Sequence, residues 1–280
     1  DTTSAGQPVY DFVPGRGENN YMLTNSGENG TSTLVSFLIN KNFDFGLDLS
    51  FGYAYTHAKD VNPMTSFTAG SSFDNVALLD INNPFAGVSN YVVPHRFTFR
   101  AIYEAEWFGA NTTQFSLFGY VQEGQPASYT MGSDALEGDQ FNGRHLLYVP
   151  TGPTDPNAIF DPAFDQQAFF DWVAAEGLSP GFQSRNDFHA DWSTRIDLAV
   201  RQEVRFTEQL SGRLYMKIYN FTNLLNSDWG KQTDAPFSNI DVVDSGYDPV
   251  SGAYTYTELT PDSRNDLQEQ RSLWELRFGV

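Results

Sequence analysis

The feature that most constrains the fold is the strictly alternating run Phe45–Thr56, with the sequence FGLDLSFGYAYT. Large apolar side chains fill its odd positions, whereas small or polar ones, including Asp48, fill its even positions. Because successive side chains of a strand point to opposite faces, this pattern predicts a β-strand with one wholly apolar face. Such a face needs a protein core or a bilayer, which about 9–11 tilted strand residues can cross.

The same alternation recurs along the chain and divides it into pairs of strands. Short turns join the strands within a pair, while long connections at 58–93, 123–191 and 220–270 join the pairs. Short turns at one end and long loops at the other are typical of outer-membrane barrels, whereas a soluble sandwich has no need for this asymmetry. The predicted strands span 32–41, 45–56, 96–107, 113–122, 195–204, 213–219 and 273–280.

Charge separates the two faces of these strands. We find no Asp, Glu, Lys or Arg on the faces assigned to lipid, although 18% of all residues are charged. A Lys or Arg at the bilayer midplane costs about 2–4 kcal/mol. A sandwich core would also exclude charge, but the opposite face here carries both signs, as expected of a polar lumen: Arg96, Arg100, Glu104, Glu106, Arg201, Glu203, Lys217, Glu275 and Arg277. The sequence therefore predicts an all-β fold, an antiparallel transmembrane β-barrel.

The long connections contain few regular elements of their own. A helix is predicted at 162–176, with Asp161 as its N-cap, Pro162 at its first position and Gly177 ending it. A small hairpin is predicted from 240–243 and 253–258, and residues 1–31 are expected to form a loop.

Composition and spacing argue against several other functions. The net charge of -19 makes nucleic acid an improbable partner, and the absence of cysteine excludes disulfides and thiolate metal sites. The histidines His57, His95, His145 and His189 have no helical i, i+4 partner. We therefore predict no zinc site and no cofactor.

Two acidic groups have alternative interpretations. Asp155, Asp161 and Asp165 lack the spacing of an EF-hand, so calcium binding is the minor alternative to ordinary capping. Glu104 and Glu106 share a strand face with arginines, which favours a salt-bridge ladder in the lumen over acid–base catalysis. We predict that the protein is not an enzyme.

Aromatic residues concentrate near the predicted strand ends. Such residues can bind sugars, but in a barrel they more often form the girdles that anchor it at the two membrane interfaces. We predict girdles from Tyr53, Tyr55, Trp107, Phe108 and Trp274.

Several short segments, in order over about residues 30–280, make the chain resemble the C-terminal part of the barrel of TonB-dependent outer-membrane receptors, specifically the Oar-like group. The resemblance is carried by 90–96 (NYVVPHR), 124–129 (GQPASY), 147–150 (LYVP) with Asp155, 176–177, 184–186 (SRN), 195–198 (RIDL) and 220–226 (NFTNLLN). One departure is the final Val280, where such barrels commonly end in Phe; Phe278 lies two positions earlier on the same face.

The resemblance implies a 22-stranded barrel filled by an N-terminal plug and energised through TonB. Residues 1–280 would then form a C-terminal portion with about the last seven strands, and the plug, the earlier strands and the TonB-contacting segment would lie outside them. The implied partners are outer-membrane lipid, the remainder of the barrel, its plug and TonB.

Three functions from different classes follow from this sequence. The first is a TonB-dependent transporter in the outer membrane of a Gram-negative-type bacterium, taking up a bulky solute such as a peptide or glycan. The second is a non-transporting barrel that acts as an adhesin or surface-assembly component, with a partner protein on its long loops. The third is a soluble, carbohydrate-binding β-sandwich. For the transporter, the upper inward-facing positions predicted to contact substrate are Arg96, Tyr120, Gln122, Arg195 and Tyr219.

Overall fold

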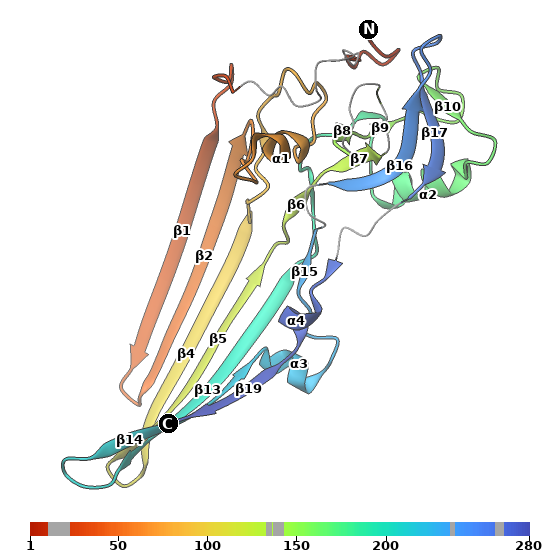
Figure 1. The fold of residues 1–280 in the computed structure, drawn as a ribbon. Helices are drawn as coiled ribbons and strands as arrows, with labels where there is room; N and C mark the ends of the chain where they lie inside the picture. Colours follow the sequence, from red (N-terminus) through yellow and green to blue (C-terminus); the bar gives the residue numbers. More distant parts are fainter. Residues whose placement is uncertain (11–22, 133–135, 137–142, 236–238, 261–265) are drawn as a thin grey trace.

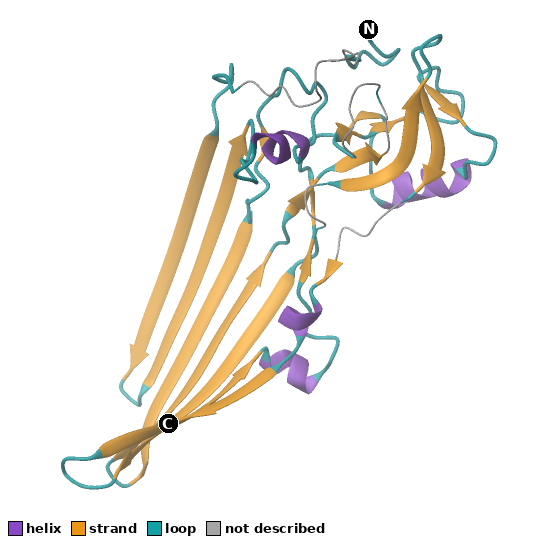
Figure 2. Cartoon of the chain, in the orientation of Figure 1, coloured by secondary structure: helices purple, strands orange, loops and turns teal. Residues whose placement is uncertain are grey.

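The computed structural model describes residues 1–10, 23–132, 136, 143–235, 239–260 and 266–280. It has two parts, a tall sheet of long strands and a compact unit at one end of that sheet (Figures 1 and 2). We call the sheet the wall and the compact unit the cap. The segment 11–22 of the predicted N-terminal loop lies outside the described residues.

The wall confirms the predicted strands in number, order and direction. Its strands are antiparallel in the order β1-β2-β4-β5-β13-β14-β19, and the short β3 (Gly87–Val88) pairs with the upper end of β2. Tight turns join β1 to β2, β4 to β5 and β13 to β14, as predicted. The strands span Thr31–Phe43 (β1), Leu47–Asp60 (β2), His95–Phe108 (β4), Asn111–Gln122 (β5), Ser193–Arg205 (β13), Ser211–Tyr219 (β14) and Glu275–Gly279 (β19).

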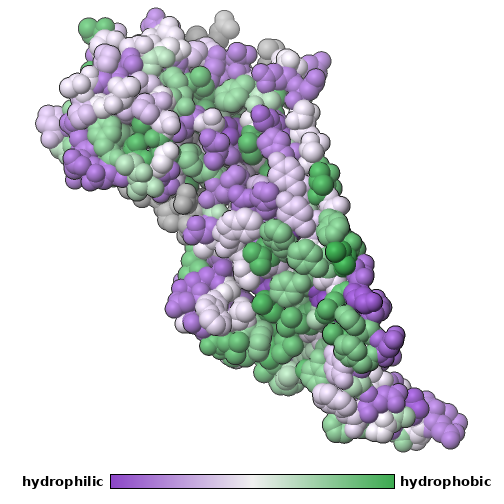
Figure 3. All heavy atoms as spheres, turned by 180° about the vertical axis from the view of Figure 1, so that it is seen from behind, coloured by the Kyte–Doolittle hydropathy of each residue, from purple (hydrophilic) through white to green (hydrophobic). Residues whose placement is uncertain are grey.

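The register of the wall places all the predicted lipid-facing side chains on one face. Cross-strand partners form apolar rows, of which one runs Ile39–Phe51–Phe99–Gly119–Ile196 and another Leu49–Ala101–Leu117–Leu198–Ile218–Leu276. Large apolar side chains on this face remain exposed: Phe37 is 53% exposed and Ile39 52%. Figure 3 shows the resulting hydrophobic region between a hydrophilic upper part and a hydrophilic lower tip. Among the described residues nothing packs over this region as the second sheet of a sandwich would.

Aromatic rings gather at both ends of this apolar face. At the cap end, His95 stacks with Tyr53 (6.1 Å between ring centroids) and with Trp192 (6.2 Å). At the turn end, Trp107 contacts Phe115 (5.2 Å) and Tyr103 (6.4 Å). From His95 to Trp107 a strand rises about 40 Å, or roughly 30 Å along the normal after tilting, which matches an apolar band bordered by two girdles.

The prediction that the lipid-facing positions carry no charge was wrong at Lys41, and Gln202 also brings a polar group to the apolar face. Lys41 lies near the turn that ends β1, and its Nζ stands 5.4 Å from the centroid of the Phe43 ring, so its long side chain can direct the charge toward the interface. Gln202 lies in the row of Ala105 and Thr113, next to the girdle at the turn end. It accepts a hydrogen bond from Thr113 Oγ1 (2.6 Å) and donates to Glu203 O (2.7 Å). Its amide is thus satisfied within the wall.

Gly119 allows an aromatic ring to lie flat against the outer face. Its cross-strand partner is Phe99, and a Cβ at position 119 would overlap the Phe99 ring. We expect Gly119→Ala to displace this ring and lower the stability of the folded barrel by about 1–3 kcal/mol. Denaturant titration of the outer-membrane protein measures the change. Gly152→Ala, whose added Cβ meets nothing within 4 Å, is the control and is expected to be neutral. Equal stability of the two variants would contradict this packing.

The cap is a single folded unit assembled from distant parts of the chain. Its sheet has the order β10-β17-β16-β7-β8, in which β16 pairs in parallel with β7 and β10 in parallel with β17. The pairing of β16 with β7 joins the connection that follows β5 to the one that follows β14. The strands span Tyr129–Gly132 (β7), His145–Leu146 (β8), Ala158–Phe160 (β10), Ile240–Tyr247 (β16) and Tyr254–Leu259 (β17).

The hydrophobic core of the chain lies in the cap, because the wall presents its apolar side chains outward. Helix α2 (Gln166–Ala175) covers the cap sheet with the buried Phe169 and Val173. The N-terminal segment joins the same unit: Gln7 is fully buried and Tyr254 Oη donates to its side-chain carbonyl. Short two-stranded ladders complete the region: β6 (Pro126–Ala127) with β12 (Phe188–His189), β9 (Tyr148–Val149) with β11 (Gly181–Phe182), and β15 (Thr233–Asp234) with β18 (Asp266–Leu267).

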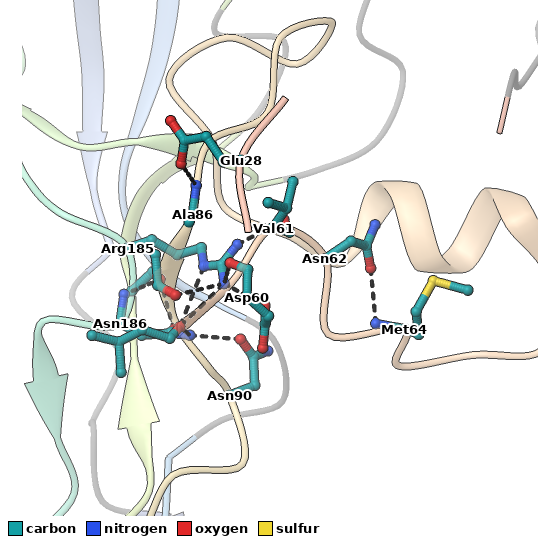
Figure 4. A network of polar contacts seen from close by, with 12 residues as sticks. Glu28, Asp60, Val61, Asn62, Met64, Ala86, Asn90, Arg185 and Asn186 are labelled. Carbon is teal, nitrogen blue, oxygen red and sulfur yellow. Dashed lines mark hydrogen bonds and ion pairs between the residues drawn. The ribbon is translucent and has the colours of Figure 1, made fainter. Parts of the chain in front are cut away.

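A buried arginine ties the cap region to the upper end of the wall (Figure 4). The Arg185 guanidinium donates to the carbonyls of Val61 (2.9 Å) and Gly87 (3.1 Å) and to the Asp60 carboxylate (2.5 Å). Its neighbour Asn186 has a positive φ of 56° and donates through Nδ2 to Asn90 Oδ1 (2.6 Å). These contacts join the connection between β5 and β13 to the connection between β2 and β4.

The helix predicted at 162–176 begins later than expected. Its N-cap is Asp165, whose side chain accepts from Ala168 N (3.0 Å), so Asp161 as the cap was wrong. Asp161 instead accepts from Ala163 N (2.8 Å) in a preceding turn that carries Phe164 into the core. Gly177, with a φ of 68°, ends the helix as predicted.

The connections hold more helical turns than the single predicted helix. Three further short helices are described: α1 (Ala69–Asp74), α3 (Phe221–Leu225) and α4 (Glu269–Ser272). The predicted hairpin is present as β16 and β17 and is longer than expected. Within the described residues, no helix is both long and apolar enough to cross a membrane.

Candidate functional site

The five predicted substrate-facing residues lie together on the polar face of the wall, at its cap end. Gln122 and Arg96 are cross-strand partners, and Tyr120 is the partner of Arg195. Tyr219 ends β14, two strands from Tyr120. Adjacent rows on one face thus bring four strands together, and we call these five residues the upper wall cluster.

The upper wall cluster is held by stacked arginine–tyrosine contacts. The Arg96 Cζ lies 4.8 Å from the centroid of the Tyr120 ring, and its Nη1 donates to Gln122 Oε1 (2.9 Å). The Arg195 Cζ lies 5.8 Å from the centroid of the Tyr219 ring, and its Nε donates to Asp197 Oδ1 (3.0 Å). Such contacts hold a guanidinium in place while most of its N–H donors remain open.

Two residues that sequence reasoning missed complete this site from the connection after β14. Tyr120 Oη donates to Gln232 Oε1 (2.9 Å), and Gln232 Nε2 donates to Thr194 O (3.0 Å). The backbone N–H of Asn220 donates to Asp197 Oδ1 (2.8 Å). No sequence signal places an irregular segment against a strand face, so only the structure reveals these contacts.

Below the upper wall cluster, the polar face is hollowed. The hollow has a volume of about 90 Å³ and arises where the small side chains Ser116 and Ala199 lie between the larger Phe118 and Tyr219. Lys217 and Asp197 contribute the charged groups of its lining. The volume suits one chemical group of a solute, because pockets that enclose whole small molecules measure roughly 300–1,000 Å³.

The three aspartates considered for calcium are separate acceptors in the cap. Asp155 is buried and accepts from Thr151 N (2.7 Å), Asn157 N (2.8 Å) and Tyr148 Oη (3.2 Å), while Asp161 and Asp165 accept from backbone N–H groups nearby. Among the described residues, no three His, Asp or Glu side chains are grouped as metal ligands.

The Asp155 contacts predict an acid-sensitive cap. Burial acts to raise the pKa of Asp155, but hydrogen bonds from Thr151, Asn157 and Tyr148 outweigh it and lower the pKa below its ordinary 3.8. Because the pKa of Asp155 is lower in the folded state than in the unfolded state, its ionised carboxylate stabilises the fold at pH values above the unfolded-state pKa. This stabilisation is lost as the pH falls through the folded-state pKa.

Accordingly, we expect amide exchange in residues 148–160 to speed up as the pH drops from about 5 toward 3, after correction for intrinsic exchange. Asp155→Asn should remove this dependence and cost about 1–3 kcal/mol, because one acceptor oxygen is lost. The exposed Asp171→Asn is the control and should keep the dependence. An unchanged profile in Asp155→Asn would refute the assignment.

The fold and its apolar belt define a class, the β-barrel proteins of the outer membrane. A family model described as "Outer membrane beta barrel domain" matches residues 2–245, and the chain belongs to that family. The protein is therefore placed in the outer membrane of a Gram-negative-type bacterium, in contact with membrane lipid. Searches of curated proteins and of solved structures found no match.

Proposed function

We propose that the chain is a sector of a TonB-dependent transporter that takes up a bulky solute, with the upper wall cluster facing that solute. The observation that carries the proposal is an open wall with a charged polar face. The described strands β1 and β19 each have one unpaired edge. Lipid cannot satisfy unpaired backbone groups, so further strands must continue the wall on both sides.

The polar face also indicates a wide barrel. A barrel of about eight strands fills its interior with its own side chains, whereas barrels of 22 strands leave a lumen that a plug occupies. The long charged residues Arg96, Arg100 and Lys217 are exposed on this face, which suits a lumen of the larger kind. Together with the resemblance to Oar-like receptors, this supports a plugged and TonB-energised barrel.

Two measurements test transport. The first is the intact mass of the native polypeptide extracted from the outer membrane, which should exceed 31.4 kDa several-fold and include plug sequence. The second compares solutes depleted from peptide- and glycan-containing medium by the wild type, a strain lacking this protein and a strain lacking TonB. The proposal expects the same solute to remain in the medium of both mutant strains. If it remained only in the medium of the strain lacking this protein, energised uptake would be contradicted.

The folded cap favours a second function, a barrel that binds a surface partner. Loops that only bordered a pore would not need a shared core, yet Tyr129, Val243 and Tyr256 from both long connections are fully buried together. This alternative expects binding of cells to a matrix or surface protein to survive loss of TonB and to disappear when the cap is destabilised.

A further inference from the structure

We propose that the hollow beneath the upper wall cluster is a binding subsite for an anionic oxygen group, a carboxylate or a phosphate, on the transported solute. This inference rests on the proposed transport function and specifies the chemistry of the solute. Three observations carry it. The cations Lys217 and Arg100 lie in or near the hollow, and the neighbouring acids already form ion pairs. In addition, two like-charged side chains lie directly opposite each other in the wall.

Basic residues are concentrated on the polar face of the wall, although the chain as a whole carries a net charge of -19. Half of its 16 Lys and Arg residues lie on that face, while most of the 35 acids lie in the connections and the cap. The same face also carries the acids Asp48, Glu104, Glu106, Asp197, Glu203 and Glu275, so its two signs nearly balance. A solute that passes the acidic outer region therefore meets a much less negative surface on the wall. The basic residues on this face are Arg96, Arg100, Arg195, Arg201, Arg205, Arg213, Lys217 and Arg277.

The acids nearest the hollow already have partners. Asp197 pairs with Arg195 and accepts the N–H of Asn220. Glu275 pairs with Arg277 on its own strand, with contacts of 2.5 and 3.0 Å. In the described part of the chain, Arg100 and Lys217 have no carboxylate within ion-pair distance, so their charge is available to a ligand.

Register brings these two cations toward the hollow from opposite sides. Lys217 is the cross-strand partner of Ala199 and lines the hollow, whereas Arg100 is the partner of Phe118 and lies one row nearer the cap, beyond Phe118. Their strands, β4 and β14, are three spacings apart, about 14 Å. Two long side chains reaching inward can span that distance and meet one anionic group between them. Ser116 supplies a hydroxyl in the lining, able to donate to the same group.

A like-charged pair in the wall supports the same conclusion. Lys217 and Arg277 are direct cross-strand partners on the polar face. Like charges placed directly opposite each other destabilise a sheet. Glu275, paired with Arg277, and the Tyr215 ring, whose centroid lies 5.3 Å from Lys217 Nζ, both moderate this repulsion, but neither gives Lys217 a carboxylate partner. Local rules are most often broken at functional sites, and a bound anion would relieve the repulsion.

The test uses the full-length receptor purified in detergent and mixed-sequence pentapeptide pools. One pool has free C-terminal carboxylates, a second is C-terminally amidated without Asp or Glu, and a third is the amidated pool with one phosphoserine. Retention is measured by depletion and mass spectrometry. We expect at least tenfold greater retention of the carboxylate pool or the phosphoserine pool than of the amidated pool. Which of the two is retained identifies the group.

Variants connect retention to the hollow. The double substitution Arg100→Gln with Lys217→Gln should reduce retention to the level of the amidated pool. Lys217→Gln should leave thermal stability unchanged or raised, because it removes the repulsion by Arg277, so loss of folding would not explain lost binding. Arg213→Gln, on the same face near the turn end and opposite Glu203, is the matched control and should retain the pool.

The possible results distinguish failure of the anionic subsite from failure of the proposed transport function. Equal retention of all pools, retention of none, or unchanged retention in the double variant would overturn the anionic subsite. Selective retention without TonB-dependent uptake would refute transport and support the subsite. TonB-dependent uptake of amidated and free peptides at equal rates would support transport and refute the subsite.

Discussion

Leu117→Arg is expected to reduce assembly of the barrel severely, whereas Ser116→Arg at the neighbouring position should leave assembly intact. Leu117 belongs to the outward row that includes Ala101, midway along β4 between His95 and Trp107. An arginine at the membrane midplane costs about 2–4 kcal/mol, a large part of the stability of a typical domain. Ser116 is directed toward the lumen, where the extra charge stays hydrated.

The comparison is made with the full-length protein in the outer membrane. The amount of heat-modifiable, folded protein should fall severely for Leu117→Arg and remain near the wild-type level for Ser116→Arg. Equal amounts of the two folded variants, or the opposite order, would show that the two faces of β5 have been assigned the wrong way round.

Arg185→Met is expected to loosen the cap from the wall by about 3–5 kcal/mol. The substitution keeps much of the side-chain volume but leaves the carbonyls of Val61 and Gly87 and the Asp60 carboxylate without their buried donor. Breaking a buried pair in this way leaves an uncompensated charge, which is far more costly than losing a surface pair.

Hydrogen exchange of the purified protein measures this effect. Protection at residues 87–88 and 185–186 should decrease in Arg185→Met while the wall strands stay protected. Arg271→Met is the control: its ion pair with Asp234 is half-exposed at the arginine, so its loss should cost at most about 1 kcal/mol. Matching profiles for the two variants would mean that the buried contacts of Arg185 do not hold the cap.

The wall could be predicted from sequence because its strands obey a local rule. Period-two alternation fixes which face each residue takes, and the tight turn between β4 and β5 makes those strands neighbours, so the sequence alone groups Arg96 with Tyr120. Arg195 follows a long connection, and its place beside Tyr120 rests on the expectation that consecutive barrel strands are neighbours. The same face also includes Lys217, but alternation alone does not show that Ser116 and Ala199 leave a hollow beside it. The stagger of the strands decides that, and it depends on the register across two interfaces, β5 with β13 and β13 with β14.

The cap could not be predicted because its organising contacts are long-range. Parallel pairing of β7 with β16 joins residues more than a hundred positions apart, and no turn signal marks it. Asp161 and Asp165 both satisfy the local pattern for an N-cap, and the choice between them depends on Phe164 entering the core. Local helix propensity could not choose between the two aspartates, because tertiary packing determines where the helix begins.

The composite cap has a consequence for the order in which the protein matures. Each wall hairpin closes over a few residues, whereas the contact of Tyr254 with Gln7 closes a loop spanning nearly the whole described chain. Loop-closure entropy delays such contacts, so hairpins form early and the cap forms last. We therefore expect the shared core of the cap to stay incomplete until its last segment, residues 240–259, lies beside the earlier connection on the same side of the wall.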